Sequence, residues 1–274
     1  MAVVTGSSSG IGFHTSLLLA RNGFHTYATM RNLNKSNSIM NMVEKEKLSL
    51  QVIQLDVNDD KSVNSAIEKI MTESKRIDVL INNAGYGLLG CVEDISLDEV
   101  RAIFETNFFG VIRVTQAILP IMRKQRNGTI VNVSSIAGKV GFPVTSAYIS
   151  TKFALEGLSE SMRYELEKFS IKVIIVEPGA VRTVFSDNMK LAKKAMVHNS
   201  SYTQLTQKVS SGLRLLLEHG TPPEEIAKVI LKAATSDNPD PRYLAGNDAV
   251  MIMEARKNMS DTDFEKFMKK EILQ

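Results

Sequence analysis

The 274-residue sequence predicts a doubly wound α/β fold, in which helices cover both faces of a parallel sheet of about seven strands. Short apolar runs rich in β-branched residues alternate with longer stretches of helical period, which is typical of a covered parallel sheet. A glycine-rich loop joins the first apolar run to the first helical stretch. Because 43% of the residues are hydrophobic, the chain can bury one large core, and we treat residues 1–274 as a single domain.

Six apolar runs are specific enough to be predicted as strands: residues 2–4, 24–29, 50–55, 79–82, 129–134 and 172–177. Helical periodicity predicts helices between them: one at 11–23 ending at Gly23, one opened by Asn58 and Asp59 as caps, and two at about 97–125 and 148–169. Such alternation implies βαβ units with right-handed crossovers.

Composition and charge exclude several classes of protein. The 33 basic and 30 acidic residues are interspersed, so the net charge of +3 favours neither nucleic acid nor a membrane surface as partner. The single cysteine, Cys91, excludes an internal disulfide and a cysteine-rich metal site, and no metal is expected. No apolar run is long enough to span a bilayer and the first residues do not resemble a signal peptide, so we expect a cytoplasmic protein. The basic stretch at 266–270 is expected to be a solvated face of the tail.

After Pro178 the rhythm of strands and helices is lost, and we expect an insertion at about 184–225 with a helix near 204–218. Long irregular segments of compact domains are commonly lids or binding loops, and the alternative is a plain surface excursion. The apolar residues of this segment either line a pocket for a lipophilic substrate or complete a core. They are Phe185, Met189, Leu191, Met196, Tyr202 and Leu205.

The loop TGSSSGIG at 5–12 lies between a strand and a helix, which is the placement that a phosphate-binding site requires. Unpaired N–H groups and the positive end of the helix dipole attract an anion there, and glycine lets the backbone approach it closely. About 20 residues further on, YATMRN presents Arg31 where NAD-binding proteins place a carboxylate. An arginine pairs with the 2′-phosphate of NADP, so we expect NADP(H), the alternative being that Arg31 is a solvated loop charge.

Two Tyr–Lys pairs are spaced by four residues, which places both side chains of each pair on one helix face. These are Tyr148 with Lys152 and Tyr164 with Lys168, and a hydroxyl lies thirteen residues before each tyrosine, on Ser135 and Thr151. Ligands of open parallel sheets bind outside the carboxyl ends of the strands, where the helix at 148–169 begins. Tyr164 lies 16 residues further along, roughly 24 Å away, so only Tyr148 can reach a cofactor.

Tyr148 is therefore the candidate general acid or base. A tyrosine that works near neutral pH needs its pKa lowered by roughly three units, or about 4 kcal/mol. An ammonium about 4 Å away contributes roughly that much at an effective dielectric of 20, so we expect Lys152 to lower the pKa of Tyr148. Ser135 would hold the substrate oxygen while Tyr148 transfers the proton.

Residues 2–185 resemble the short-chain dehydrogenase/reductase family, and most closely its branch of hydroxysteroid and retinol dehydrogenases. The motifs that carry the resemblance are TGSSSGIG at 5–12, LDV at 55–57, NNAG at 82–85, Asn107, the set of Ser135, Tyr148 and Lys152, and PGAVRT at 178–183. The resemblance implies a Rossmann fold. One departure is Thr151, since relatives usually carry serine immediately before the catalytic lysine.

The resemblance also implies roles for individual residues. Asp56 and Val57 would flank the adenine, Asn83 would lie beside the ribose, and Asn107 would anchor a water that connects Lys152 to solvent. Val181 and Thr183 would contact the nicotinamide carboxamide, and Lys152 the nicotinamide ribose. The catalytic set would be Ser135, Tyr148, Lys152 and Asn107, and the cofactor-binding set Gly6, Ser7, Ser8, Ser9, Gly10, Ile11, Gly12, Arg31, Asp56, Val57, Asn83, Ala84, Gly85, Tyr148, Lys152, Pro178, Gly179, Val181 and Thr183.

These observations predict an NADP(H)-dependent oxidoreductase that transfers hydride between the nicotinamide and a ketone, an aldehyde or a secondary alcohol. The alternative is a catalytically silent NADP-binding sensor or interaction protein, although the four catalytic positions are all filled. Sugar epimerases and dehydratases also use a Tyr–Lys pair, but their glycines are spaced differently. The resemblance further implies a homodimer or homotetramer in which the helices around 105–125 and 148–168 pair across a subunit interface. Neither the substrate nor the direction of reaction follows from the sequence.

Overall fold

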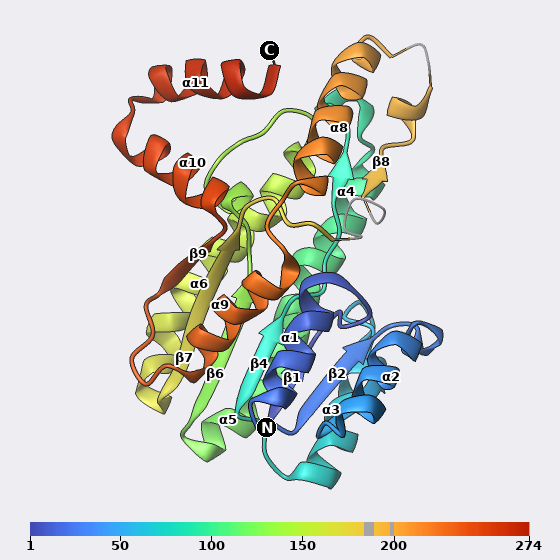
Figure 1. Cartoon of the computed structure of the whole chain (residues 1–274), viewed down its shortest axis with the longest axis vertical. Coiled ribbons are helices and arrows are strands. Elements are labelled where there is room, and N and C mark those ends of the chain that lie inside the picture. The colour runs from blue at the N-terminus through green and yellow to red at the C-terminus, as the bar shows by residue number, and fades with distance from the viewer. Residues whose placement is uncertain (184–188, 198–199, 274) are drawn as a thin grey trace.

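A seven-stranded parallel sheet forms the centre of the molecule, as Figure 1 shows. The computed structural model describes residues 1–183, 189–197 and 200–273. The strand order is β3-β2-β1-β4-β6-β7-β9, so the chain reverses its direction of winding between β1 and β4. The strands are β1 (Ala2–Val4), β2 (Thr26–Met30), β3 (Leu50–Gln54), β4 (Val79–Asn82), β6 (Gly128–Val133), β7 (Ile171–Pro178) and β9 (Arg242–Ala245). The predicted doubly wound fold is confirmed.

The six predicted strands are all present, and the seventh is β9 at the edge of the sheet. Its sequence, RYLA, is short, and only Ala245 is fully buried. An edge strand of this kind lacks the continuous apolar run that marks the central strands, which is why no strand was predicted at its position.

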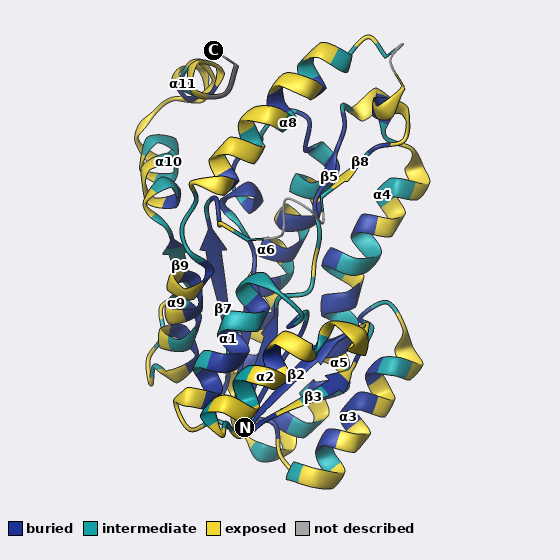
Figure 2. Cartoon of the chain, turned by 45° about the vertical axis from the view of Figure 1, so that its right-hand side comes forward, coloured by how far each residue is buried: buried dark blue, intermediate teal, exposed yellow. Residues whose placement is uncertain are grey.

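Helices cover both faces of the sheet. The α-helices that the structure describes, including those that lie beyond the carboxyl edge, are α1 (Gly10–Arg21), α2 (Asn37–Glu46), α3 (Asp60–Ser74), α4 (Leu97–Phe104), α5 (Gly110–Gln125), α6 (Ser146–Leu166), α8 (Thr203–Glu218), α9 (Pro223–Thr235), α10 (Asn247–Asn258) and α11 (Asp261–Leu273). Side chains of a strand alternate between its faces: Val3 packs with α3, α5 and α6, whereas its neighbours Ala2 and Val4 pack with α1 and α9. The sheet is consequently buried on both sides (Figure 2).

The stretch predicted as one helix at 97–125 is interrupted. A π-helical segment, Glu105–Phe109, separates α4 from α5 and carries Asn107. Such segments shift the helix by one residue and often mark functional sites. The position of Asn107 therefore depends on a local irregularity that the period of the sequence does not reveal.

The segment after β7 lies above the carboxyl ends of the strands. Its predicted helix is present as α8, and a short strand, β8 (Lys190–Leu191), pairs with β5 (Leu88–Leu89). Residues 184–188 and 198–199 of the predicted insertion, Phe185 among them, lie outside the described residues. Helices α10 and α11 approach the same edge from the opposite side (Figure 1).

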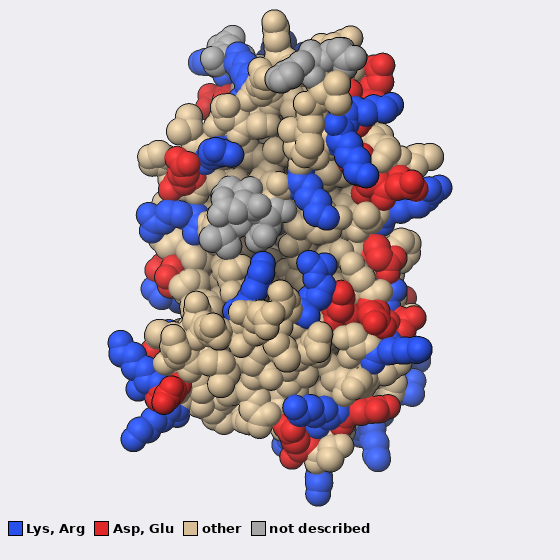
Figure 3. Space-filling model, turned by 90° about the vertical axis from the view of Figure 1, so that its right-hand side faces the viewer, with Lys and Arg blue, Asp and Glu red and all other residues tan. Residues whose placement is uncertain are grey.

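The prediction of a solvated face at 266–270 is only half correct. The lysines of α11 are exposed, but Phe264 and Met268 on its other side are 8% and 9% exposed because they pack against Val140. Basic and acidic side chains are interspersed on the face that Figure 3 shows. None of the helices in the described part of the chain is long and apolar enough to cross a membrane.

Candidate active site

The glycine-rich loop leaves β1 and enters α1 at the carboxyl edge of the sheet. Gly6 and Gly10 adopt positive φ angles of +69° and +58°, a conformation that favours glycine. A Cβ atom on Gly6 would lie 2.8 Å from the Cα atom of Ala84, so the loop packs directly against the NNAG segment after β4.

The start of α1 fits an anionic group. Within the described residues its N-cap, Ser9, makes no side-chain capping hydrogen bond, and the first turn contains no acidic residue. The first amide groups of the helix and its positive dipole end therefore face the loop without a competing carboxylate. A dinucleotide pyrophosphate has the charge that such a site attracts.

Thr5 joins the loop to the next strand, and the sequence analysis did not include it among the site residues. Its Oγ1 atom accepts hydrogen bonds from the backbone N–H groups of Asn83 (3.0 Å) and Ala84 (3.1 Å). Asn83 in turn donates from Nδ2 to the carbonyl oxygens of Thr5 (2.9 Å) and Gly6 (3.2 Å). The side chain of Asn83 thus supports the loop.

Asn107 connects two walls of the site. Its Oδ1 atom accepts from the backbone N–H of Tyr86 (3.0 Å), and its Nδ2 atom donates to the carbonyl of Tyr86 (2.9 Å) and to Oγ1 of Thr151 (3.2 Å). The Thr151 hydroxyl donates to the carbonyl of Tyr148 at 2.6 Å. Threonine therefore supplies a hydroxyl contact at the position where relatives usually carry serine.

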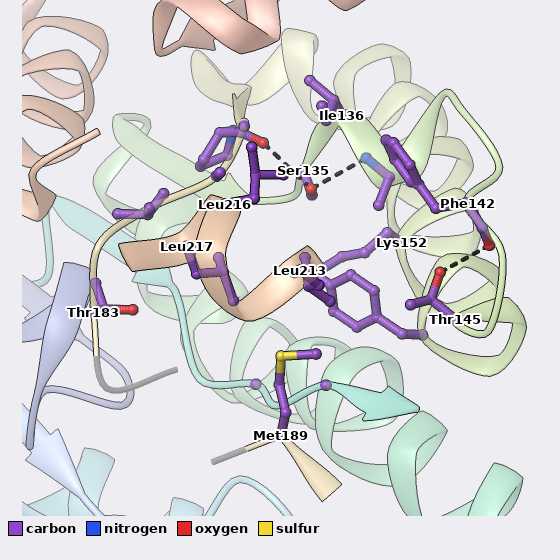
Figure 4. Close-up of a pocket in the computed structure, with 18 of the residues that line it drawn as sticks. Ser135, Ile136, Phe142, Thr145, Lys152, Thr183, Met189, Leu213, Leu216 and Leu217 are labelled. Carbon is purple, nitrogen blue, oxygen red and sulfur yellow. Dashed lines mark hydrogen bonds between the residues drawn. The ribbon is translucent and has the colours of Figure 1, made fainter. Parts of the chain in front are cut away.

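Ser135, Tyr148 and Lys152 line one cavity where β6 ends and α6 begins. Figure 4 shows Ser135 and Lys152 in its wall. The hydroxyl of Ser135 donates to the carbonyl of Pro178 (3.3 Å) and accepts from the N–H of Ala137 (3.1 Å). Nζ of Lys152 donates to the carbonyl of Val133 (2.9 Å) and lies 5.8 Å from the centroid of the Tyr148 ring. Tyr164, the rival tyrosine, is 79% exposed and does not line this cavity.

The expectation that Lys152 lowers the pKa of Tyr148 is wrong for the protein alone. Burial raises the pKa of Tyr148 to about 12, and the hydrogen bond with Ser135 opposes this only partly. Burial likewise lowers the pKa of Lys152 to about 8, against the stabilising charge of Glu156. Burial disfavours the charged form of each side chain, so Tyr148 is a neutral phenol that can donate a proton.

One cavity of about 560 Å³ contains most of the predicted site residues. Those that line it are Gly6, Ser8, Ser9, Gly10, Ile11, Asn83, Ala84, Gly85, Ser135, Tyr148, Lys152, Pro178, Gly179, Val181 and Thr183. Those that do not are Ser7, Gly12, Arg31, Asp56, Val57 and Asn107.

The residues outside the lining have other positions. Ser7 is completely buried and its hydroxyl donates to the carbonyl of Val4, so its side chain stabilises the loop on the side away from the cavity. Asp56 accepts a hydrogen bond from the N–H of Asn58 (3.0 Å). Arg31 is exposed, yet its charge lowers the pKa of Tyr86, which lines the cavity, against the larger effect of burial. Arg31 therefore lies near the cavity wall.

The remaining wall is apolar: part of it comes from α8, which lies in the predicted insertion, and part from α10 and α11, which the sequence analysis did not connect with the site. It includes Phe142, Met189, Leu213, Leu216, Leu217, Met251, Ile252, Phe267 and Met268. Figure 4 shows Met189 and the three leucines of α8 around the same space. The spacing of Phe264, Phe267 and Met268 marks an apolar face of α11 and is the signal that could have indicated this wall.

The apolar residues at 184–225 were expected either to line a pocket or to complete a core, and different residues do each. Met189 lines the cavity, whereas Leu191 and Leu205 pack into small cores. Met196 is exposed, and the Tyr202 hydroxyl donates to a carboxylate oxygen of Glu93 at 3.0 Å.

A buried acidic pair lies next to the candidate catalytic residues. Glu156 of α6 and Glu177 of β7 share Arg242 of β9, whose Nε donates to Oε2 of Glu156 (3.1 Å) and lies 3.2 Å from Oε1 of Glu177. Burial, followed by the charge of Glu156, raises the pKa of Glu177 to about 7.

The pair predicts how stability depends on pH. The unfolded state has the ordinary pKa of 4.5, so between pH 4.5 and 7 the folded state binds more protons and its free energy of unfolding falls as pH rises. We expect Glu177→Gln to remove this decline and to stabilise the protein by about 3 kcal/mol at pH 8, since the pKa rises from 4.5 to about 7 on folding and one pKa unit is worth about 1.4 kcal/mol.

Urea unfolding at pH 5 and pH 8 measures the effect. Glu160→Gln is the control, because Glu160 also pairs with Arg242 but is half-exposed, and it should change both values little. Equal pH dependence in the Glu177→Gln variant and the unmodified protein would contradict the prediction.

The fold and the site together define a class of protein: a dinucleotide-binding oxidoreductase whose site lies at the carboxyl edge of a doubly wound sheet. The short chain dehydrogenase family matches residues 1–194, and the chain belongs to this family. Among curated relatives, it is 36% identical over 244 residues to 3-ketodihydrosphingosine reductase of Bacteroides thetaiotaomicron, covering 89% of this chain and 87% of that protein. It is 33% identical over 265 residues to human 17-beta-hydroxysteroid dehydrogenase type 1, covering 93% and 80%.

Solved structures agree with this assignment. A short-chain dehydrogenase from Streptomyces avermitilis superposes with a TM-score of 0.83 at 31% identity, covering 98% of this chain and 97% of that one. A metagenomic short-chain oxidoreductase in complex with NADP superposes with a TM-score of 0.71 at 25% identity, covering 89% and 95%.

Proposed function

We propose that the protein is an NADP(H)-dependent oxidoreductase that interconverts a carbonyl group and an alcohol, with Tyr148 as general acid or base. One observation carries the proposal: Ser135, Tyr148 and Lys152 line the same cavity as the glycine-rich loop. A group bound at the loop and a substrate at the phenol would therefore share one enclosed space, as proximity catalysis requires.

The roles of the residues follow from their contacts. A bound nicotinamide would supply hydride to the carbonyl carbon in the direction of reduction. The Ser135 hydroxyl, oriented by the N–H of Ala137, would hold the substrate oxygen. Tyr148, protonated throughout the neutral range, would donate its proton to that oxygen, and the Lys152 ammonium would stabilise the phenolate that remains.

A panel of carbonyl compounds tests the function directly. Consumption of NADPH is measured with aliphatic, aromatic, steroid and long-chain ketones and aldehydes. The apolar wall from α8, α10 and α11 supports a lipophilic substrate. Turnover confined to small hydrophilic ketones would contradict the lipophilic class. Binding of NADPH without turnover of any compound would favour the silent, cofactor-sensing alternative.

Arg31 is proposed to select NADP over NAD by pairing with the 2′-phosphate. A hydrogen bond to a charged group contributes about 1.5–3 kcal/mol, so Arg31→Asp is expected to lower kcat/KM for NADPH by roughly 10- to 100-fold. The new carboxylate should instead favour the ribose hydroxyls of NADH.

The two coenzymes are compared by kcat/KM in both proteins. Lys35→Asp is the matched control, because Lys35 is an exposed cation four residues after Arg31 and the charge change is the same. A similar loss in the two variants would show a general charge effect and contradict a specific role for Arg31.

We also propose a homodimer or homotetramer that uses the surface of α5 and α6. Phe109, at the start of α5, and Phe153 of α6 are 47% and 46% exposed, and pairing of these helices with a second subunit would cover both rings. Light scattering after size exclusion measures the mass, and a monomer at micromolar concentration would contradict the proposal.

A further inference from the structure

The buried acids Glu156 and Glu177 carry charge that the proposed reaction does not use. Glu156 lies four residues after Lys152, on the same face of α6 and one turn further from the cavity. Glu177 immediately precedes Pro178, whose carbonyl accepts the hydrogen bond from Ser135. The pair therefore borders both of the elements that carry the catalytic residues.

The packing around Glu156 is specific. A Cβ atom on Gly138 would lie 2.8 Å from Cγ of Glu156 and 2.9 Å from the hydroxyl oxygen of Ser134. Gly138 belongs to the short turn Ile136–Gly138 that follows Ser135. Only a residue without a side chain leaves room for the Glu156 side chain behind this turn.

Lys152 and the two buried acids differ in the partners that stabilise their charges. The Lys152 ammonium is buried and its hydrogen-bond partner is the neutral carbonyl of Val133. The carboxylate that favours its charged form is that of Glu156. Burial and the charge of Glu156 raise the pKa of Glu177 to about 7, so below that pH Glu177 is protonated and the pair carries a single negative charge.

Other charged groups also face the pair. Arg242 contacts both carboxyl groups and Glu160, while Lys139 follows the turn at 136–138 and Arg163 lies further along α6. Arg242 is thus the counter-ion that lets the two acids remain buried. Glu156 is the member of the pair that lies on the same helix as Lys152.

We propose that Glu156 is a positioning residue for Lys152: its carboxylate, one turn further along α6 and paired with Arg242, keeps the buried lysine in its ammonium form. A charged lysine is what the proposed reaction needs to stabilise the tyrosine phenolate. The catalytic consequence rests on the proposed function, whereas the charge coupling between the two side chains does not.

Titration of Lys152 in the full-length protein tests the coupling. Lysine labelled with carbon-13 at the ε position is followed by NMR from pH 6 to 10, and Lys152→Met identifies its signal. We expect a midpoint of about 8 in the unmodified protein and a midpoint at least one unit lower in Glu156→Gln. In Glu177→Gln the Lys152 midpoint should stay near 8, because Glu156 keeps its negative charge in that variant. An unshifted midpoint in Glu156→Gln would overturn the proposal.

Activity supplies a second readout. The assay uses a carbonyl compound that the unmodified protein reduces. Glu156→Gln is expected to lower kcat/KM roughly fivefold at pH 8, and only slightly at pH 6, where Lys152 is charged in both proteins. Glu156→Asp should restore the profile, and Glu160→Gln should not change it. If Glu156→Gln does not fold, the double variant E156Q/E177Q, in which both buried acids become neutral amides and Arg242 keeps Glu160 as its counter-ion, replaces it with an expected shift in the same direction.

The two proposals fail in different ways. A shifted titration in a protein that reduces no carbonyl compound refutes the proposed reaction and leaves the charge coupling intact. An active enzyme whose Lys152 titrates identically in Glu156→Gln and the unmodified protein refutes the coupling alone.

Discussion

Replacing Tyr148 with phenylalanine is expected to lower kcat/KM for a carbonyl substrate by roughly 10²- to 10⁴-fold, the range that a general acid contributes. The variant removes one hydroxyl and keeps the ring that packs against Leu88, Ile103 and Ala147. Because burial keeps the phenol protonated, with a pKa of about 12, the loss should be similar across the neutral range in the direction of reduction.

The measurement combines initial rates of NADPH consumption with the dissociation constant of NADPH from fluorescence. Tyr164→Phe is the matched control: the same hydroxyl is removed from the other tyrosine with a lysine four residues on, at an exposed position. It should retain full activity. Undiminished turnover in Tyr148→Phe would refute the proposed mechanism, whereas loss of NADPH binding would show that the variant had disturbed the cofactor site instead.

The second large effect is expected from Gly12→Ala, which should abolish measurable binding of NADPH. A Cβ atom on Gly12 would overlap the carbonyl oxygen of Gly6 and Nδ2 of Asn83, so either the loop or the segment after β4 must move. Overpacking of this kind costs about 1–3 kcal/mol, and the displaced loop would lose its alignment with the first turn of α1.

Fluorescence titration with NADPH and thermal unfolding measure the two consequences. The control is Gly157→Ala in α6, where an added Cβ atom would meet nothing within 4 Å. This change should stabilise the protein by about 0.5–1 kcal/mol, because alanine loses less conformational entropy in a helix. Normal affinity for NADPH in Gly12→Ala would show that the close packing of the loop is not needed for binding.

The sequence by itself determined six of the seven strands of the sheet, the place of the glycine-rich loop between the first strand and the first helix, and the choice between two tyrosines. These features depend on local patterns: β-branched runs, helical period and glycine spacing. Even the choice of Tyr148 over Tyr164 required only the rule that sites form at the carboxyl edge of parallel strands, together with the rise of a helix. The structure agrees, since Tyr148 lines the cavity and Tyr164 does not.

Only the tertiary structure decided which residues outside these patterns reach the site and how its side chains titrate. The apolar faces of α10 and α11 line the cavity although they lie about 100 residues after Tyr148 in the chain. The π-helical segment places Asn107 against Tyr86 and Thr151. The pKa of Tyr148 rises because many distant residues together exclude water from it. Exclusion of water depends on the packing of the whole chain, and short-range patterns of residues do not encode it.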